Sequence, residues 1–125
     1  MLIPHLHFCG ECAEAIALYE KAFGTKAGAD INYTSDDKKI AHADMVIHGQ
    51  TVFLNDALDV KKQLPELDAV HLIITFKTPS ELLACYEILK AGDNSINPFR
   101  ETPYSKLCGN FLDKFGVMWG FMADA

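Results

Sequence analysis

Long apolar runs and clusters of positive charge are both missing from this sequence of 125 residues. No apolar run approaches the roughly 18 residues that a membrane-spanning helix needs. Acidic residues outnumber basic ones by 17 to 11, which gives a formal net charge of −6. A nucleic-acid backbone or an anionic membrane would be repelled by this charge. The sequence therefore predicts no nucleic-acid partner and no membrane partner.

Several signatures of export and catalysis are also missing. The first residues lack the basic and then apolar order of a secretory signal, so we expect a cytoplasmic protein whose four cysteines are reduced thiols. We find no HExxH zinc motif, no phosphate-binding glycine loop and no Ser-His-Asp order. The length suits one ordinary domain, and half of the residues are hydrophobic, which is enough for a core.

An internal repeat is the most informative feature that is present. The segment "AEAIALYE" (13–20) matches "SELLACYE" (80–87) at four of eight positions, with an offset of 67 residues. The same offset brings Gly49, before "QTVFLND", onto Gly116, before "VMWGFMAD". Two matches at one offset indicate a duplication.

Each half reads as one strand, one helix and three further strands. Apolar spacing predicts helices over 13–22 and 80–90, and Thr78, Pro79 and Glu81 form a start signal for the second. Strands are expected at 2–8, 27–34, 39–49 and 51–56 in the first half, and at 69–76, 95–101, 106–113 and 117–123 in the second, with "DKFG" (113–116) as a turn. The predicted fold class is α+β with two βαβββ modules, at 1–57 and 68–125, joined by a linker at 58–67.

This order of elements resembles that of the vicinal-oxygen-chelate superfamily, the glyoxalase and bleomycin-resistance fold, and within it the PhnB-like branch. The resemblance is carried by "PHLHFCGECAEAIALYEKAFG" (4–24), "IAHADMVIHGQTVFLNDA" (40–57), "ET" (101–102) and "DKFGVMWGF" (113–121). It implies curved mixed sheets around a cavity, with the helices on the outer side and a small organic molecule as ligand. It also implies a homodimer in which each cavity is built from both chains.

The stretch "HLHFCGEC" (5–12) concentrates histidine and cysteine. On a strand, His5, His7 and Cys9 share one face, which the resemblance turns toward the cavity. A single zinc site with all its ligands in this stretch is excluded, because His5 and Cys9 would lie roughly 13 Å apart. Cys9 and Cys12 leave two interpretations open. They form a redox dithiol at a helix N-terminus, or Cys12 packs in the core and Cys9 lines a wall. We expect no disulfide between them.

The resemblance also raises the question of a metal. Superfamily enzymes hold a divalent ion with side chains from the first and last strands of each module, and the first-strand positions match His5 and His71, which suit Zn, Ni, Fe or Mn. The last-strand positions match Phe53 and Gly120, and neither is a carboxylate. A catalytic zinc site usually has three protein ligands. A third ligand would have to be His7, Asn55 or His42, and the alternative is a metal-free cavity.

Strand alternation and the resemblance together give a set of expected ligand-binding side chains. These are His7, Cys9, His42, Phe53, Asn55 and Tyr104. The same alternation places Val52, Leu54, Trp119 and Phe121 in the core.

Three functional hypotheses remain, and the sequence does not decide whether the chain is an enzyme. The first is a PhnB-like protein that binds a small organic molecule. The second is a divalent-metal-dependent lyase, isomerase or dioxygenase of the same superfamily. The third is a thiol redox protein that uses Cys9 and Cys12.

Overall fold

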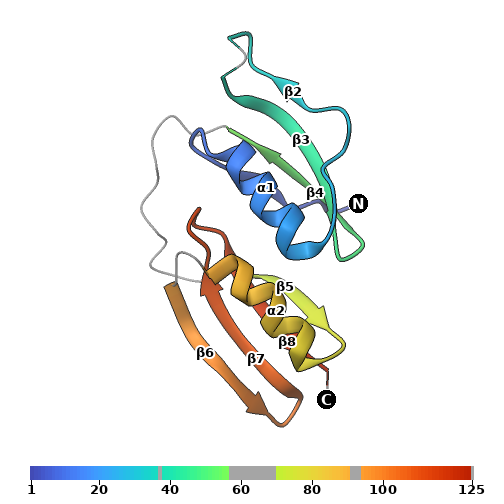
Figure 1. The fold of residues 1–125 in the computed structure, drawn as a ribbon, viewed down its shortest axis with the longest axis vertical. Helices are drawn as coiled ribbons and strands as arrows, with labels where there is room; N and C mark the ends of the chain where they lie inside the picture. The colour runs from blue at the N-terminus through green and yellow to red at the C-terminus, as the bar shows by residue number, and fades with distance from the viewer. Residues whose placement is uncertain (37, 57–69, 91–93, 125) are drawn as a thin grey trace. The chain divides into compact units, whose positions relative to one another are not determined.

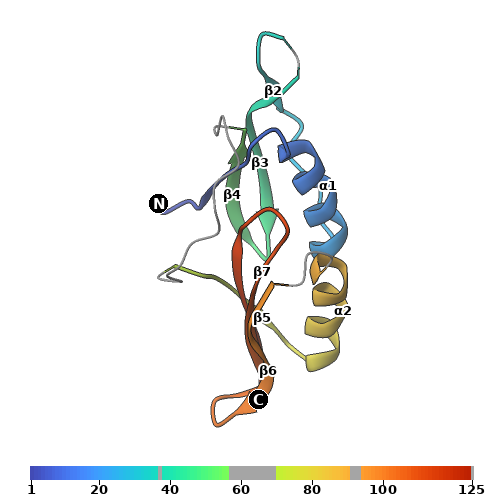
Figure 2. The ribbon, with the colours of Figure 1, turned by 90° about the vertical axis from the view of Figure 1, so that its left-hand side faces the viewer.

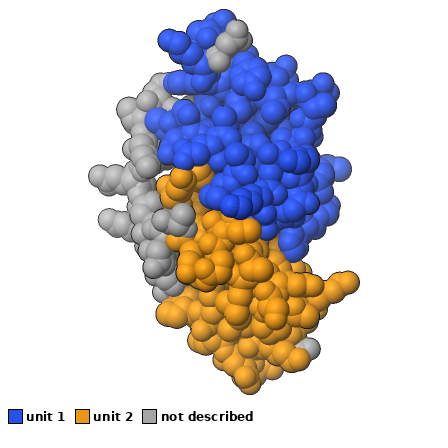
Figure 3. Space-filling view, in the orientation of Figure 1, with its two compact units in different colours: residues 1–63 blue, residues 64–125 orange. Residues whose placement is uncertain are grey.

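The computed structural model describes residues 1–36, 38–56, 70–90 and 94–124. The chain forms two compact units, residues 1–63 and 64–125, which Figure 3 shows in different colours. The linker predicted at 58–67 lies outside the described residues. No helix in the described part of the chain is long and apolar enough to cross a membrane.

The first unit is a four-stranded sheet with one helix (Figure 1). Its elements are β1 (His5–His7), α1 (Cys12–Phe23), β2 (Asn32–Tyr33), β3 (Ile40–Ile47) and β4 (Gln50–Asn55). The spatial order is β1-β4-β3-β2, in which β1 and β4 are parallel and the other pairs are antiparallel. Figure 2 shows that α1 lies on one side of this sheet.

The second unit repeats this topology. Its elements are β5 (Leu72–Phe76), α2 (Pro79–Leu89), β6 (Asn94–Thr102), β7 (Ser105–Leu112) and β8 (Met118–Ala123), in the spatial order β5-β8-β7-β6. Again the first and last strands are parallel, and the helix lies on one side of the sheet (Figure 2). The prediction of two βαβββ modules is confirmed, and both helices begin and end within one residue of the predicted bounds.

The prediction of a strand at 27–34 is wrong for most of these residues, because only the two residues of β2 form a strand there. Ala27 makes an isolated bridge with Met45, and the Gly28 N–H donates to the Asp44 carbonyl at 2.8 Å. A Cβ at Gly28 would collide with the Asp44 carboxylate. Glycine and aspartate are poor strand formers, so Gly28 and Asp30 interrupt the ladder that the apolar residues suggested.

The core of each unit lies between the helix and one face of the sheet. In the first unit it includes Phe8, Tyr19 and Leu54, and in the second it includes Leu82 and Trp119, all of them buried. Strand alternation predicted this face correctly for Val52, Leu54, Trp119 and Phe121. Leu6 and Leu72, on the same face at the sheet edges, are half-buried. The opposite face of each sheet, which no helix covers, is called the open face below.

The two helices begin in different ways. At α2 the Thr78 Oγ1 accepts from the Glu81 N–H at 3.2 Å, as a start signal of this kind predicts. At α1 the N-cap residue Glu11 makes no side-chain capping bond. Instead Asp56, just after β4, accepts from the Cys12 N–H at 3.0 Å and from the Ile40 N–H at 3.0 Å. The start of α1 is therefore capped by a carboxylate distant in sequence.

Candidate functional site

Aromatic and polar side chains gather on the open face of the first unit. The strand register places His5 opposite Phe53 and His7 opposite Asn55. The rings of His5 and His7 lie 4.3 Å apart, and His42 packs edge-on against Phe53 at 4.8 Å. The His7 Nδ1 and Asn55 Oδ1 atoms are hydrogen-bonded at 2.7 Å. Four of the expected ligand-binding residues, His7, His42, Phe53 and Asn55, therefore lie together.

His5 is the electrostatically perturbed member of this group. Partial burial lowers its pKa, and positive charge on His7 and His42 lowers it further. The result is a histidine that stays neutral to lower pH than usual. Cys9, the remaining residue expected here, is half-buried just after β1.

The side chains present do not fit a three-ligand metal centre. Among the described residues, no three His, Cys, Asp or Glu side chains are grouped so that they could hold a metal ion. His5 belongs to the first unit and His71 to the second. The register also places Ile73, rather than His71, opposite Gly120, so His71 lies two residues before the position that corresponds to His5.

His71 is held by a chain of two amides in the second unit. The Asn97 Nδ2 donates to the Asn110 Oδ1 at 2.6 Å, and the Asn110 Nδ2 contacts the His71 Nδ1 at 2.8 Å. An amide nitrogen only donates, so the His71 Nδ1 accepts and the ring hydrogen lies on Nε2. Metal-binding histidines usually have the reverse arrangement, with the non-ligating nitrogen donating to a protein acceptor. The hydrogen bonds of His71 therefore fit a polar wall residue better than a metal ligand.

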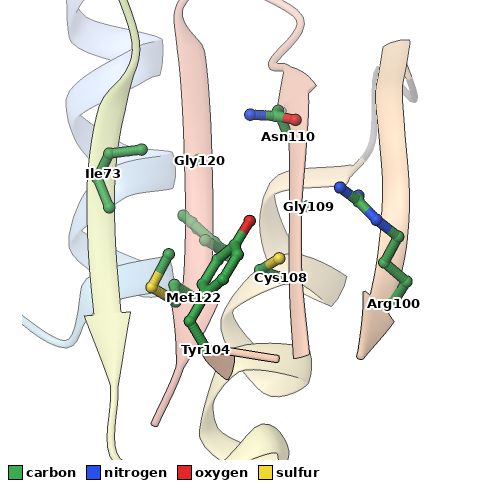
Figure 4. Close-up of a pocket in the computed structure, with 9 residues that line it drawn as sticks. Ile73, Arg100, Tyr104, Cys108, Gly109, Asn110, Gly120 and Met122 are labelled. Atoms are coloured by element: carbon green, nitrogen blue, oxygen red, sulfur yellow. The ribbon is translucent and has the colours of Figure 1, made fainter. Parts of the chain in front are cut away.

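A pocket of about 130 Å³ opens on the open face of the second unit (Figure 4). Its lining includes Ile73, Arg100, Tyr104, Asn110 and Met122. In Figure 4 the Tyr104 side chain rises from below toward the middle of the pocket, and Ile73 extends from β5 at the left. Tyr104, predicted as a wall residue, lines this pocket and is 65% exposed.

Gly120 makes room for the Ile73 side chain at the wall of this pocket. A Cβ at Gly120 would collide with the Cδ1 of Ile73 and lie 3.7 Å from the Asn110 Nδ2. The corresponding residue of the first unit is Phe53, whose ring lies between those of His5 and His42. The two open faces therefore differ at the same position of the repeat. One carries a phenyl ring where the other carries no side chain.

Sequence reasoning missed Arg100 as a site residue. It stands beside Phe99, which packs on Tyr86 at 4.7 Å in the core, whereas Arg100 lines the pocket on the open face. The register pairs Arg100 with Cys108, another lining residue. The segment "FRETPY" (99–104) contains Arg100, but its assignment to the site requires knowing that its neighbour Phe99 is a core residue.

The cysteines are free thiols, and Cys12 is fully buried. Burial raises the pKa of the Cys12 thiol to about 12, and the negative charge of Asp56 contributes. A helix N-terminus normally favours a thiolate, but at α1 it is already occupied by the Asp56 carboxylate. This arrangement matches the interpretation of Cys12 as a core residue.

Comparisons with known proteins agree with this architecture. A family model described as 3-demethylubiquinone-9 3-methyltransferase matches residues 1–122. Protein YjdN of Escherichia coli (strain K12) is 26% identical to the chain over 136 residues, which cover 94% of this chain and 91% of that protein.

Solved structures give the same fold. The putative 3-demethylubiquinone-9 3-methyltransferase, PhnB protein, from Bacillus cereus has a TM-score of 0.82 at 23% identity and covers 98% of each chain. Protein PA1353 from Pseudomonas aeruginosa has a TM-score of 0.81 at 22% identity, over 99% of this chain and 97% of that one. A glyoxylase/bleomycin resistance protein/dioxygenase domain from Frankia sp. EAN1pec has a TM-score of 0.72 at 19% identity, over 100% of this chain and 91% of that one.

Proposed function

Because the chain belongs to the family described as 3-demethylubiquinone-9 3-methyltransferase and has the glyoxalase/bleomycin-resistance fold, we propose that it is a PhnB-like protein that binds a small organic molecule on the open face. The observation that carries this proposal is the pocket of the second unit over Gly120. Apolar walls with a few converging polar groups are typical of small-molecule sites. Here the apolar walls are Ile73 and Met122, and the polar groups are those of Arg100, Tyr104 and Asn110.

The size of the pocket favours a small ligand or one small part of a larger one. Its volume is about 130 Å³, close to the roughly 150 Å³ of an engineered cavity that binds benzene. A nucleotide-sized methyl donor would need a site in the range of roughly 300–1,000 Å³. We therefore do not assign methyl transfer to this pocket.

The metal-dependent alternative is less well supported by the side chains. Phe53 and Gly120 offer no carboxylate, and the hydrogen bonds of His71 place its ring hydrogen on Nε2. Elemental analysis of protein purified without chelator tests this alternative. One equivalent of Zn, Ni, Fe or Mn, lost on mutation of His5 to Ala, would revive it.

The thiol redox alternative is also less well supported, because Cys12 is buried beside a carboxylate. A thiolate there would face both burial and the charge of Asp56. Rapid alkylation of native Cys12 by iodoacetamide at neutral pH would overturn this argument.

Ligand binding can be tested by amide NMR of the full chain against a library of ring-sized fragments. We expect some fragments to shift the amide signals of Gly109, Asn110 and Gly120. The G120A variant should lose these shifts, since its methyl group would push Ile73 into the pocket. The L83A variant is the control, because Leu83 is exposed on α2, on the other side of the sheet. If no fragment moves these signals, the proposal is wrong.

We also propose a cytoplasmic homodimer, as the PhnB-like resemblance implies. Exposed apolar side chains support it, among them Val46 on β3 and Ile73 on β5. Light scattering at micromolar concentration should give about twice the chain mass of 13.9 kDa. A mass near that of one chain would contradict the dimer.

A further inference from the structure

The pocket of the second unit contains a single charge. Of the nine residues that line it, all in the described part of the chain, only Arg100 is charged. The remaining lining groups are apolar, amide, hydroxyl or thiol groups and glycine backbone.

Backbone register directs Arg100 into the pocket. The strand register is irregular on both sides of Arg100, but it pairs Arg100 with Cys108, which lines the pocket, so the Arg100 side chain leaves β6 on the open face. In Figure 4 its guanidinium reaches from β6 toward β7, at the side of the pocket where Asn110 stands. Within the described residues, no carboxylate forms an ion pair with Arg100.

We propose that this pocket binds a small organic anion, with its carboxylate or phosphate group against the Arg100 guanidinium. Its apolar body, about the size of one ring, lies between Ile73, Met122 and Tyr104. This inference rests on the proposed function and adds the charge and the orientation of the ligand. It follows from a planar guanidinium that can donate two parallel hydrogen bonds to an oxyanion.

Each lining group then has a defined part. Gly120 is buried and has no side chain, so the Ile73 Cδ1 packs directly against its backbone and forms an apolar wall for the body of the ligand. The Tyr104 ring is exposed and lies near Met122 in Figure 4, so in this arrangement it covers the body from the solvent side. Asn110 is committed to Asn97 and His71, so it shapes the wall and leaves the charged contact to Arg100.

Three matched probes test the proposal on the full chain by amide NMR titration. Benzoate carries a carboxylate, phenyl phosphate carries a phosphate, and benzamide is the neutral isostere of benzoate. We expect benzoate or phenyl phosphate to shift the amide signals of Gly109, Asn110 and Gly120, at about tenfold or more higher affinity than benzamide. The stronger of the two anions identifies the oxyanion class.

Two variants assign the charge dependence to one residue. R100Q should remove the preference for anions while benzamide binding stays the same. K77Q removes one positive charge from an exposed residue between β5 and α2 and should leave all three titrations unchanged. Chemical shift dispersion of each variant shows that it is folded.

The outcomes separate this inference from the proposed function. If all three probes bind equally well, or if R100Q keeps the preference for anions, the charge assignment is wrong while small-molecule binding stands. If none of the three moves the pocket signals although neutral fragments do, the assignment is also wrong. If no fragment of any kind moves them, the proposed function itself fails.

Discussion

At the scale of single residues, Asp56 and Asp113 each bind backbone N–H groups in the interior of one unit. Asp113 is 1% exposed and accepts from the N–H groups of Phe115 and Val117 and from the Trp119 Nε1, at 2.9, 3.0 and 2.9 Å. It thereby joins the turn before β8 to the only tryptophan of the chain. The sequence predicted a turn at 113–116, but nothing in the string of letters shows which side chain closes it.

The D113N variant should be clearly destabilised. An amide has one acceptor oxygen and two donor hydrogens, so at least one of the three N–H groups would face another donor. We expect the free energy of unfolding to fall by about 1–3 kcal/mol, the range for an unsatisfied buried donor. Urea unfolding followed by circular dichroism measures this. The D124N variant is the control, since Asp124 is exposed, and an equal loss in both variants would refute the explanation.

At the scale of elements, the helices and most strands follow from local pattern. The start signal formed by Thr78, Pro79 and Glu81 predicts where α2 begins. Strand alternation assigns Leu54 and Trp119 to the helix-covered face of the sheet and their neighbours Phe53 and Gly120 to the open face. The start of α1 was predicted to within one residue, but its capping group could not be predicted, because Asp56 is 44 residues away. The pocket could not be predicted either, since its lining depends on the register in which the strands of the second unit pair. Arg100 and Ile73 enter it through register alone.

The T78A variant tests the local contribution at α2. Loss of the Oγ1 acceptor leaves the Glu81 N–H unpaired at the helix end. We expect a loss of about 1 kcal/mol in the free energy of unfolding. T78S keeps the hydroxyl and should restore most of the stability, as measured by chemical denaturation. A variant T78S as unstable as T78A would show that the hydroxyl is not the cause.

At the scale of the whole molecule, two buried thiols, Cys12 in the first unit and Cys85 in the second, couple stability to alkaline pH. Burial raises the pKa of Cys12 and of Cys85 to about 12, from the usual 9.0, and Asp56 adds to the effect at Cys12. Between these values the unfolded chain has lost thiol protons that the folded chain still holds. The contribution of these two thiols to stability is therefore fully present below pH 9 and is lost as pH rises toward 12.

The expected result is a free energy of unfolding that decreases between pH 9 and pH 12. A variant with both C12A and C85A should show a shallower decrease over the same range. It lacks the two thiols whose protons the folded chain keeps and the unfolded chain loses. Denaturant titrations at a series of pH values measure the two slopes. Identical slopes in the two proteins would mean that these thiols do not carry the effect.

A duplicated chain would ordinarily offer two equivalent receptors, one for each repeat. Here the repeat has diverged at its central strand, where Phe53 opposes His5 in one unit and Gly120 opposes Ile73 in the other. In one copy this position carries a phenyl ring, whereas in the other it carries no side chain and Ile73 packs beside the backbone at the wall of a pocket. Calorimetric titration should therefore saturate at one equivalent of ligand for each polypeptide, and a dimer should take up two molecules rather than four.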